Sequence, residues 1–198
     1  MLFTVMPDAE HPAITNEGMV YEGQRHRVTC SLAGKPYGQP FGLDIAFADP
    51  ILGEPDIVVA SDVLGFAGVD PPTLRLYPLE THIAEELHAY TLPRKRPNSR
   101  MKDLPDIALL AGVRELEATR LRQALEQTFT SRKTHALPVS FPPPPPAWAG
   151  PYGRMVAEDE LAWADLATLT RAVEAFLEPV LDGTALRIWA PSMWRWEP

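Results

Sequence analysis

Apolar and polar residues alternate over much of the first third of the chain, as they do in half-buried β-strands. An apolar run covers residues 2–6, and an alternating stretch covers residues 21–32. After a turn at Gly34-Lys35-Pro36, residues 41–47 place Phe41 and Leu43 on one face. This pattern predicts paired strands, with further short strands at residues 56–60 and 73–77.

The pattern changes to helical spacing in the rest of the chain. Between residues 79 and 90 an apolar residue recurs every three or four positions, and Pro93 ends the run. Similar stripes predict helices at residues 103–111, 115–132 and 160–177, with Pro179 near the end of the last one. Strands followed by helices indicate an α+β fold.

Four segments follow from this division. Residues 1–76 are expected to be β-rich, residues 77–137 to form a helical core, and residues 155–198 to form a helix with a tryptophan-rich tail. Residues 138–154 are proline-rich. They could be a ligand for an aromatic groove, but we favour a strut that packs across its own domain. Trp189, Trp194 and Trp196 could stack on bases or dock a partner, although covering the edge of the core is the favoured interpretation.

Composition narrows the class of protein. The formal net charge of −8 over 198 residues argues against a surface that binds nucleic acid everywhere, although a local basic patch remains possible. Cys30 is the single cysteine, so an internal disulfide is impossible and a reducing compartment is expected. No apolar run is long enough to cross a bilayer, and no secretion signal is recognisable. The expected location is the cytoplasm.

Acidic and basic residues are most concentrated between Tyr77 and Ala111, where we expect the chemistry. The charged and histidine residues of this stretch that matter most are Glu85, Glu86, His88, Arg94, Lys95, Arg96, Arg100, Lys102, Asp103 and Asp106. Plainer interpretations remain open: Asp103 could be a helix N-cap, and residues 94–102 could be a solvated loop. A metal site of the helical-bundle kind is not expected, because Glu85-x-x-His88 occurs once and such sites need it twice.

Asp44 is the other candidate. It projects from the face of its strand opposite to Leu43 and Ile45. If that face is solvated, the carboxylate is ordinary. If the face lines a cleft, Asp44 becomes a candidate metal ligand or general base.

Three motifs in order, FGLDIAFADP, YPLETHIAEELHAYT and NSRMKDLPDIALL, resemble the nucleotidyltransferase AbiEii/AbiGii toxin family. The similarity continues through THALP, PPPPPAW and LEPVLDG, and therefore covers nearly the whole chain. The resemblance implies a DNA-polymerase-β-like fold, of which this chain would form a partial antiparallel or mixed sheet followed by a helical C-terminal portion. It also implies a toxin with a cognate antitoxin.

The implied activity is transfer of a nucleotide from a nucleoside triphosphate (NTP), with Mg²⁺, to an RNA acceptor that is tRNA in some members. By resemblance Asp44 is a strand acid for catalysis and metal binding, Asp103 is a base or charge-orienting group, and Asp106 supports it. The resemblance also places four substrate-binding residues, of which the two basic ones would face phosphates: Glu85, Glu86, Arg100 and Lys102.

Two departures from the family pattern leave two hypotheses. The chain lacks the Gly-Ser and Asp-x-Asp motifs that usually come first, and Glu86 stands where a lysine is expected. The first hypothesis is an enzyme that is active when those motifs are supplied by a longer start or another chain. The second is a degenerate relative that binds RNA or an antitoxin without catalysis. A purely structural α+β domain is a weaker third possibility.

Overall fold

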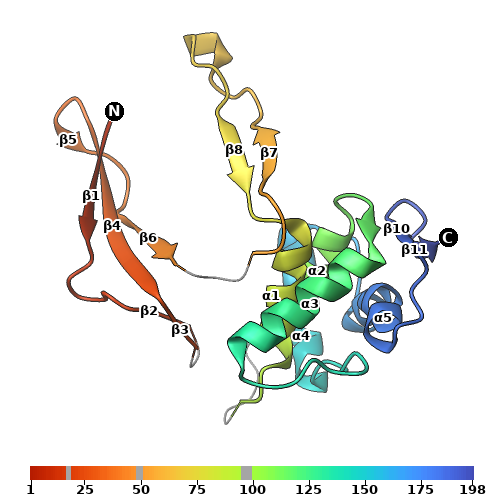
Figure 1. The fold of residues 1–198 in the computed structure, drawn as a ribbon. Coiled ribbons are helices and arrows are strands. Elements are labelled where there is room, and N and C mark those ends of the chain that lie inside the picture. The colour runs from red at the N-terminus through yellow and green to blue at the C-terminus, as the bar shows by residue number, and fades with distance from the viewer. Residues whose placement is uncertain (17–18, 48–50, 95–99) are drawn as a thin grey trace. The chain divides into compact units, whose positions relative to one another are not determined.

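The computed structural model describes residues 1–16, 19–47, 51–94 and 100–198, so Lys95 and Arg96 of the basic loop lie outside the described residues. The chain forms two compact units, residues 1–49 and 50–198, which are treated separately below. Figure 1 shows strands alone in the first unit and mainly helices in the second. The structure has mixed antiparallel sheets and five α-helices in these ranges, which confirms the α+β class.

The first unit is an antiparallel sheet centred on one long strand. This strand, β4 (Gly23–Leu32), pairs with β1 (Leu2–Pro7), β5 (Lys35–Pro36) and β6 (Phe41–Ala46). The strands expected at residues 2–6, 21–32 and 41–47 are thereby confirmed. The turn from β4 to β5 contains Ala33 and Gly34 at φ 50° and 78°, positive values that suit a tight hairpin. A small hairpin joins β2 (Ile14–Asn16) to β3 (Met19–Tyr21).

The second unit begins with a hairpin of β7 (Asp56–Val59) and β8 (Thr73–Leu76), with the 3₁₀ turn η1 (Gly65–Ala67) between them. Its body contains α1 (Leu79–Thr91), α2 (Asp103–Ala111), α3 (Ala118–Arg132), α4 (Ala149–Asp159) and α5 (Leu166–Asp182). A short sheet orders β11 (Arg195–Glu197), β10 (Ile188–Ala190) and β9 (Leu116–Glu117), and η2 (Pro146–Trp148) precedes α4.

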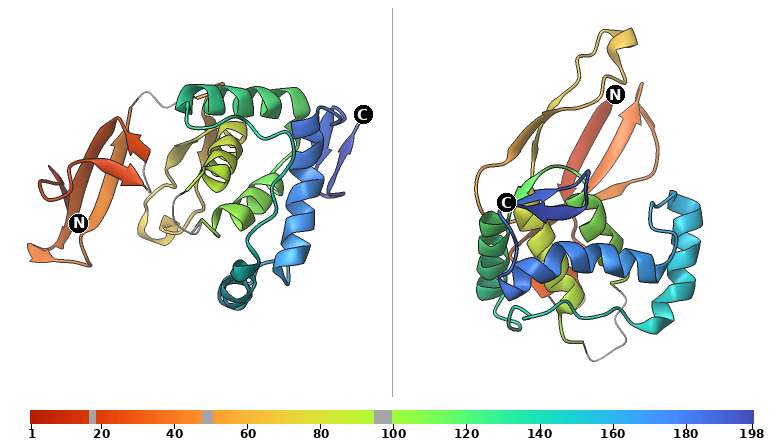
Figure 2. Two further views of the ribbon diagram at one scale, coloured as in Figure 1. Left: turned by 90° about the horizontal axis from the view of Figure 1, so that it is seen from below. Right: turned by 90° about the vertical axis from the view of Figure 1, so that its right-hand side faces the viewer.

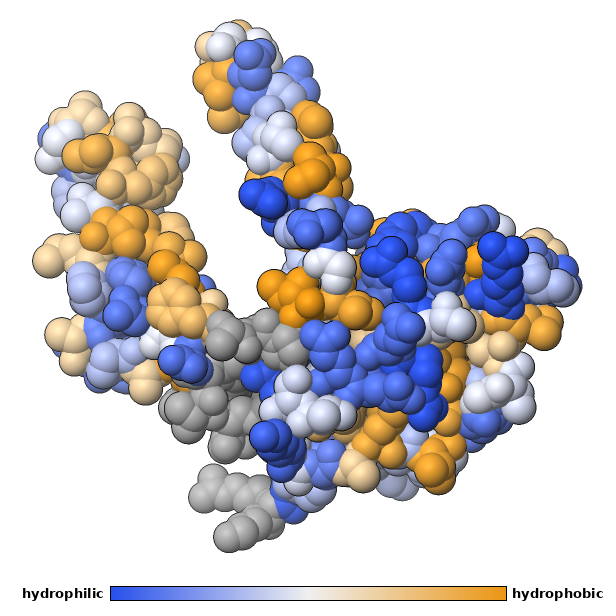
Figure 3. Space-filling view, viewed as in Figure 1, coloured by the Kyte–Doolittle hydropathy of each residue, from blue (hydrophilic) through white to orange (hydrophobic). Residues whose placement is uncertain are grey.

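Apolar side chains lie open along the β7–β8 hairpin (Figure 3). Ile57 and Val59 are each 62% exposed, and Phe66 at the turn is 90% exposed. A two-stranded hairpin gains little stability by itself, so its exposed apolar area is available for contact. In the described parts of the chain, no helix is long and apolar enough to span a membrane.

The helices α1 and α2 form where the apolar spacing predicts them. Ile83, Leu87, Leu104 and Ile107 are completely buried between the helices of the second unit. Pro78 precedes the first turn of α1, a place where its missing N–H costs no helical hydrogen bond.

The last predicted helix is wrong in its bounds. Residues 149–159 form the separate helix α4, which ends at Glu160 in a left-handed conformation with φ 52°. The next helix, α5, starts only at Leu166, because the Asp165 side chain accepts the Thr168 N–H at 2.7 Å and caps it. Pro179 lies inside α5, which continues to Asp182.

The cap predicts a measurable stability change. Replacing Asp165 with alanine is expected to lower the free energy of unfolding by about 1 kcal/mol, since the carboxylate bonds both the N–H and the hydroxyl of Thr168. Urea denaturation of the two proteins measures the difference. Exposed Glu158 supplies the control, since its replacement with alanine should change stability by less than about 0.5 kcal/mol. Equal effects of the two variants would contradict the role of the cap.

The tryptophan-rich tail closes the core of the second unit. Trp189 is completely buried, and its ring centroid lies 4.8 Å from that of Phe176 and 5.5 Å from that of Trp196. Its indole N–H donates to the Ala111 carbonyl at 2.8 Å. Figure 2 shows β10 and β11, which carry the tail, beside α5. The tail therefore covers the core, as the favoured interpretation expects.

The proline-rich segment packs on its own unit. Phe141 is buried and stacks on the Tyr90 ring at a centroid distance of 5.3 Å. The Tyr90 hydroxyl donates to the Pro142 carbonyl at 2.8 Å. These contacts tie the segment to the end of α1, in the manner of a strut.

Candidate functional site

The start of α2 brings Arg100 and Asp103 together. The Arg100 Nε donates to Asp103 Oδ2 at 3.0 Å, and Asp103 is 3% exposed. Asp103 is the first residue of α2, and Lys102 holds the N-cap position without a side-chain cap. Asp103 therefore contributes a buried, ion-paired carboxylate rather than the N-cap considered from the sequence.

The environment of Asp103 favours its protonated form. Burial, together with the nearby Glu86 carboxylate, raises the pKa of Asp103 to about 7, although the charge and hydrogen bond of Arg100 oppose this rise. Burial and Glu86 also raise the pKa of Asp106. Asp103, Asp106 and Glu86 therefore interact electrostatically across the α1–α2 contact, and a proton at Asp103 relieves part of their repulsion.

Glu86 has a histidine partner on its own helix. The His82 Nε2 lies 3.5 Å from Glu86 Oε1, one turn earlier on α1. Glu86 raises the pKa of His82, and Asp106 adds to that effect. His82 was not predicted from the sequence, although its i,i+4 spacing from Glu86 was the available signal.

Glu85 contacts a different helix. Its Oε2 accepts from the Arg132 guanidinium of α3 at 3.0 and 3.2 Å. Adjacent positions on a helix point about 100° apart, so Glu85 and Glu86 serve different contacts. Glu85 as a substrate-binding residue stays a prediction.

The basic residues of the segment between α1 and α2 make different contacts. Arg94 donates to the Ala89 carbonyl at 2.9 Å, so it helps to satisfy the end of α1. Lys102 is exposed, and its positive charge opposes the rise in the pKa of Asp106. Arg100 and Lys102 are therefore the described basic side chains at the acidic end of α2.

Asp44 lies in the first unit, on β6. Both of its carboxylate oxygens accept from Arg25, at 2.6 and 2.7 Å, and the two residues are cross-strand partners in the β4–β6 register. This hydrogen-bonded pair lowers the pKa of Asp44. The Arg25 partner was missed from the sequence, because the register of two strands decides which side chains meet.

The described residues do not assemble a Mg²⁺ site. No group of three His, Cys, Asp or Glu side chains in these parts of the chain could hold a metal ion. The Asp44 carboxylate, by itself on its strand, already binds Arg25 in a bidentate manner. Tight Mg²⁺ binding requires several oxygen ligands in octahedral geometry, and the described residues of neither unit by itself provide such a donor set.

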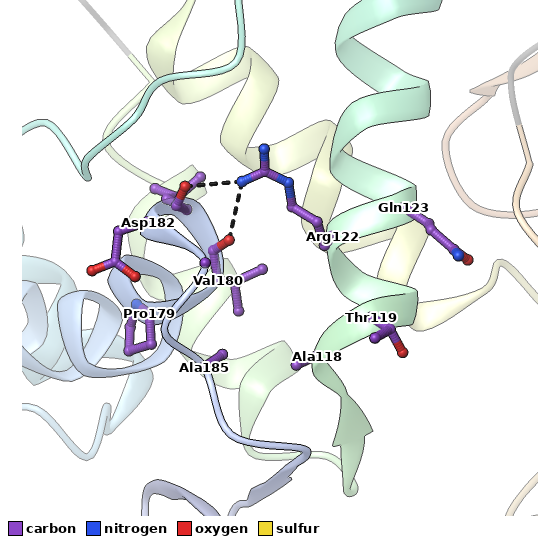
Figure 4. Close-up of a pocket in the computed structure, with 10 residues that line it drawn as sticks. Ala118, Thr119, Arg122, Gln123, Pro179, Val180, Asp182 and Ala185 are labelled. Atoms are coloured by element: carbon purple, nitrogen blue, oxygen red, sulfur yellow. Dashed lines mark hydrogen bonds between the residues drawn. The ribbon is translucent and has the colours of Figure 1, made fainter.

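A cavity of about 460 Å³ lies between α3 and α5 (Figure 4). Arg122 reaches across it and donates to the Val180 and Leu181 carbonyls, at 3.1 and 2.9 Å. It thereby satisfies carbonyls at the end of α5 that lack helical partners. None of the candidate residues from the sequence lines this cavity, and the role seen for Arg122 is structural.

The raised pKa of Asp103 predicts a pH dependence. The pKa of Asp103 in the folded protein is near 7, above the ordinary 3.8. Its protonated form therefore contributes stability that is fully present below pH 3.8 and is lost as pH rises to 7. The stability of the wild-type protein relative to Asp103→Asn should therefore fall between pH 5 and 7, by up to about 1.4 kcal/mol per pH unit. Urea denaturation at pH 5 and pH 7 measures the free energy of unfolding of both proteins. A wild-type stability that rises with pH relative to that of Asp103→Asn would contradict the raised pKa of Asp103.

The comparison with protein families identifies the chain. The family described as "Nucleotidyl transferase AbiEii toxin, Type IV TA system" matches residues 3–195, which is nearly the whole sequence. No curated protein gave a significant match. The family match agrees with the motifs on β6, α1 and α2 that carry the resemblance. The chain therefore belongs to the AbiEii nucleotidyltransferase toxin family of type IV toxin–antitoxin systems.

Proposed function

We propose that this protein transfers a nucleotide from an NTP to an RNA acceptor, with Asp103 as the general base. One observation carries the proposal: Asp103 is buried, bonded to Arg100 at 3.0 Å, and has a pKa of about 7. A general base works best when its pKa is close to the working pH. Family membership supports the class of reaction.

In the proposed step, bonds change at the acceptor hydroxyl and at the α-phosphorus of the NTP. The acceptor hydroxyl gives its proton to an Asp103 oxygen, its own oxygen bonds to the α-phosphorus of the NTP, and the bond to pyrophosphate breaks. Arg100 and Lys102 would meet the phosphates, since guanidinium and ammonium groups bind them well. The Asp106 charge helps to keep the pKa of Asp103 high, which makes it a supporting residue.

Mg²⁺ enters this proposal with the NTP, as the usual complex of the triphosphate. It supplies neutralisation of the phosphate charge. We assign no step to a metal held by the described side chains, because they do not form a metal site. Asp44 as a metal ligand, and as a catalytic residue, stays a prediction.

The direct test is incubation of the purified chain with each labelled NTP, Mg²⁺ and total tRNA. Label is expected to enter RNA with at least one of the four nucleotides, and EDTA should prevent it. Circular dichroism on the same sample shows whether the chain is folded. A folded chain that labels no RNA, with any nucleotide, contradicts the proposal.

Glu86 favours a second candidate function, a binding module without catalysis. Its carboxylate raises the pKa of both Asp103 and Asp106, so the site is rich in negative charge that repels a triphosphate. Replacing Glu86 with lysine should separate the candidates. An enzyme should gain NTP affinity and transfer rate, whereas a binding module should show no transfer before or after the change.

The proposed partners follow from the family. Membership of a toxin–antitoxin family supports a cognate antitoxin protein as a partner. The cytoplasm is the proposed location, because the proposed RNA substrate is found there. Binding of the chain to a candidate antitoxin protein, measured by calorimetry, tests the first of these proposals. Absence of binding by a folded chain would contradict it.

A further inference from the structure

Two histidines and two threonines join the end of α1 to the segment after α3. The His88 Nε2 lies 2.7 Å from Thr134 Oγ1, which lies 3.0 Å from His135 Nδ1. The His135 Nε2 lies 2.8 Å from Thr91 Oγ1. The Thr91 hydroxyl donates to the Leu87 carbonyl at 2.8 Å. These contacts form one continuous chain of hydrogen bonds.

Two observations set the direction of these bonds. The Thr91 hydroxyl lies within bonding distance of the Leu87 carbonyl. His88 Nδ1 is buried without a partner among the described residues, so the reverse direction would leave a buried N–H unpaired. A hydroxyl has one hydrogen, and that of Thr91 is used on Leu87, so Thr91 accepts from an Nε2–H of His135. A neutral His135 then has a bare Nδ1, which accepts the Thr134 hydroxyl hydrogen. The Thr134 oxygen in turn accepts from an Nε2–H of His88. Both imidazoles are therefore neutral Nε2–H tautomers.

We propose that His88, Thr134, His135 and Thr91 form an acid-sensitive latch, which fastens residues 133–137 to α1 only while both imidazoles are neutral. Protonation of His88 adds a charge and an N–H at Nδ1, which is buried and has no hydrogen-bond partner in the described parts of the chain. Protonation of His135 only reverses its bond with Thr134, whose oxygen can accept two N–H donors, but it places a second charged ring next to His88. Either charge is better solvated when the segment leaves α1, so a proton favours the open latch.

The surroundings oppose a charged imidazole. His88 is completely buried, with its ring 5.0 Å from Phe129 and 4.8 Å from His135. The charged groups that face it are Arg132 of α3 and Glu85 of α1, which pair with each other at 3.0 Å. Neither supplies an uncompensated negative charge to hold an imidazolium.

The charged groups near His135 also pair with each other. A cavity of about 290 Å³ places His135 close to Arg122 and Glu126 of α3, which pair with each other at 2.6 Å. Burial lowers the pKa of His135, and burial with the neighbouring His135 and Arg132 lowers that of His88 to about 4. Because both values lie below the ordinary 6.5, the latch is complete above pH 6.5 and opens as pH falls toward 4.

The backbone turns sharply at the end of α3, where the latched segment begins. Lys133 ends α3 in the left-handed conformation, φ 53°, which is uncommon for a residue with a side chain. This turn directs residues 134–137 back toward α1. Without the latch, the sharp turn at Lys133 would relax and the segment would leave α1.

Hydrogen–deuterium exchange of the full chain tests the proposal. After correction for intrinsic rates, residues 133–137 should exchange about tenfold faster at pH 5 than at pH 7.4, while residues 188–197 should not change. Thr134→Val should exchange fast at both pH values, and Thr134→Ser should behave as the wild type. Thr134 is exposed, so neither variant should disturb the core.

Nitrogen-15 NMR of the imidazoles provides an independent reading. At pH 7.4 both His88 and His135 should be neutral with the proton on Nε2. A Nδ1–H tautomer or a charged ring at either position overturns the proposal. So does protection of residues 133–137 that is independent of pH, or that persists in Thr134→Val.

Discussion

Replacing Trp189 with alanine will lower the free energy of unfolding by about 4 kcal/mol. The indole is completely buried and lies against Phe176, Trp194 and Trp196, at ring centroid distances of 4.8, 5.3 and 5.5 Å. Its loss removes these contacts and leaves a cavity that the neighbouring rings fill only in part. It also leaves the buried Ala111 carbonyl without its donor. Urea denaturation followed by circular dichroism measures the change.

A smaller substitution separates packing from hydrogen bonding. Trp189→Phe keeps an aromatic ring but loses the N–H that bonds Ala111, so it should cost about 2 kcal/mol. The two variants should therefore rank in the order wild type, phenylalanine, alanine. A cost of less than about 1 kcal/mol for alanine would show that the tail is not part of the cooperative core.

Replacing Asp103 with asparagine should reduce the transfer of label to RNA by about 10²- to 10⁴-fold. Asparagine has nearly the same size as aspartate but cannot take a proton from the acceptor hydroxyl. The wild-type rate should also fall as pH drops below about 7, because the pKa of Asp103 lies there and its protonated form is no base. Initial rates between pH 6 and 8.5 measure both effects.

Two matched variants serve as controls for this prediction. Asp106→Asn removes a charge that raises the pKa of Asp103, so it should shift the pH profile to lower pH and reduce the maximum rate less. Exposed Glu158 lies on α4, and Glu158→Gln should leave the rate unchanged. A full rate in Asp103→Asn would exclude this residue as the base, even if the chain transfers nucleotides.

The helices with a regular apolar spacing could be predicted well. Leu79, Ile83 and Leu87 repeat with the helical period, and α1 forms there. The helix α4 was missed because Gly150, Pro151 and Gly153 lower its intrinsic helix propensity. Its formation depends on tertiary contacts, among them the completely buried Tyr152, whose hydroxyl donates to the Trp163 carbonyl at 2.8 Å.

The contacts between side chains of the candidate site also depend on tertiary structure, which the sequence pattern does not reveal. The charge-rich segment pointed to Asp103, and the structure adds its burial and its bond to Arg100. The Arg132 partner of Glu85 lies 47 positions away in the sequence, and only the packing of α1 on α3 brings them together. Local patterns therefore identified the residue types of the site, whereas tertiary structure decided which neighbours set their charge.

The place of Trp196 in the core affects when this protein can fold during synthesis. Its ring stacks on that of Phe176 at 5.9 Å, and its N–H donates to the Phe176 carbonyl at 2.9 Å. The second unit therefore cannot complete its core until residue 196 has left the ribosome. At about 5–20 residues per second, Ala111 at the end of α2 emerges roughly 4 to 17 seconds earlier than residue 196. During that interval α1 and α2 exist without the tail that covers their core, and a nascent helical unit is exposed to chaperones and proteases.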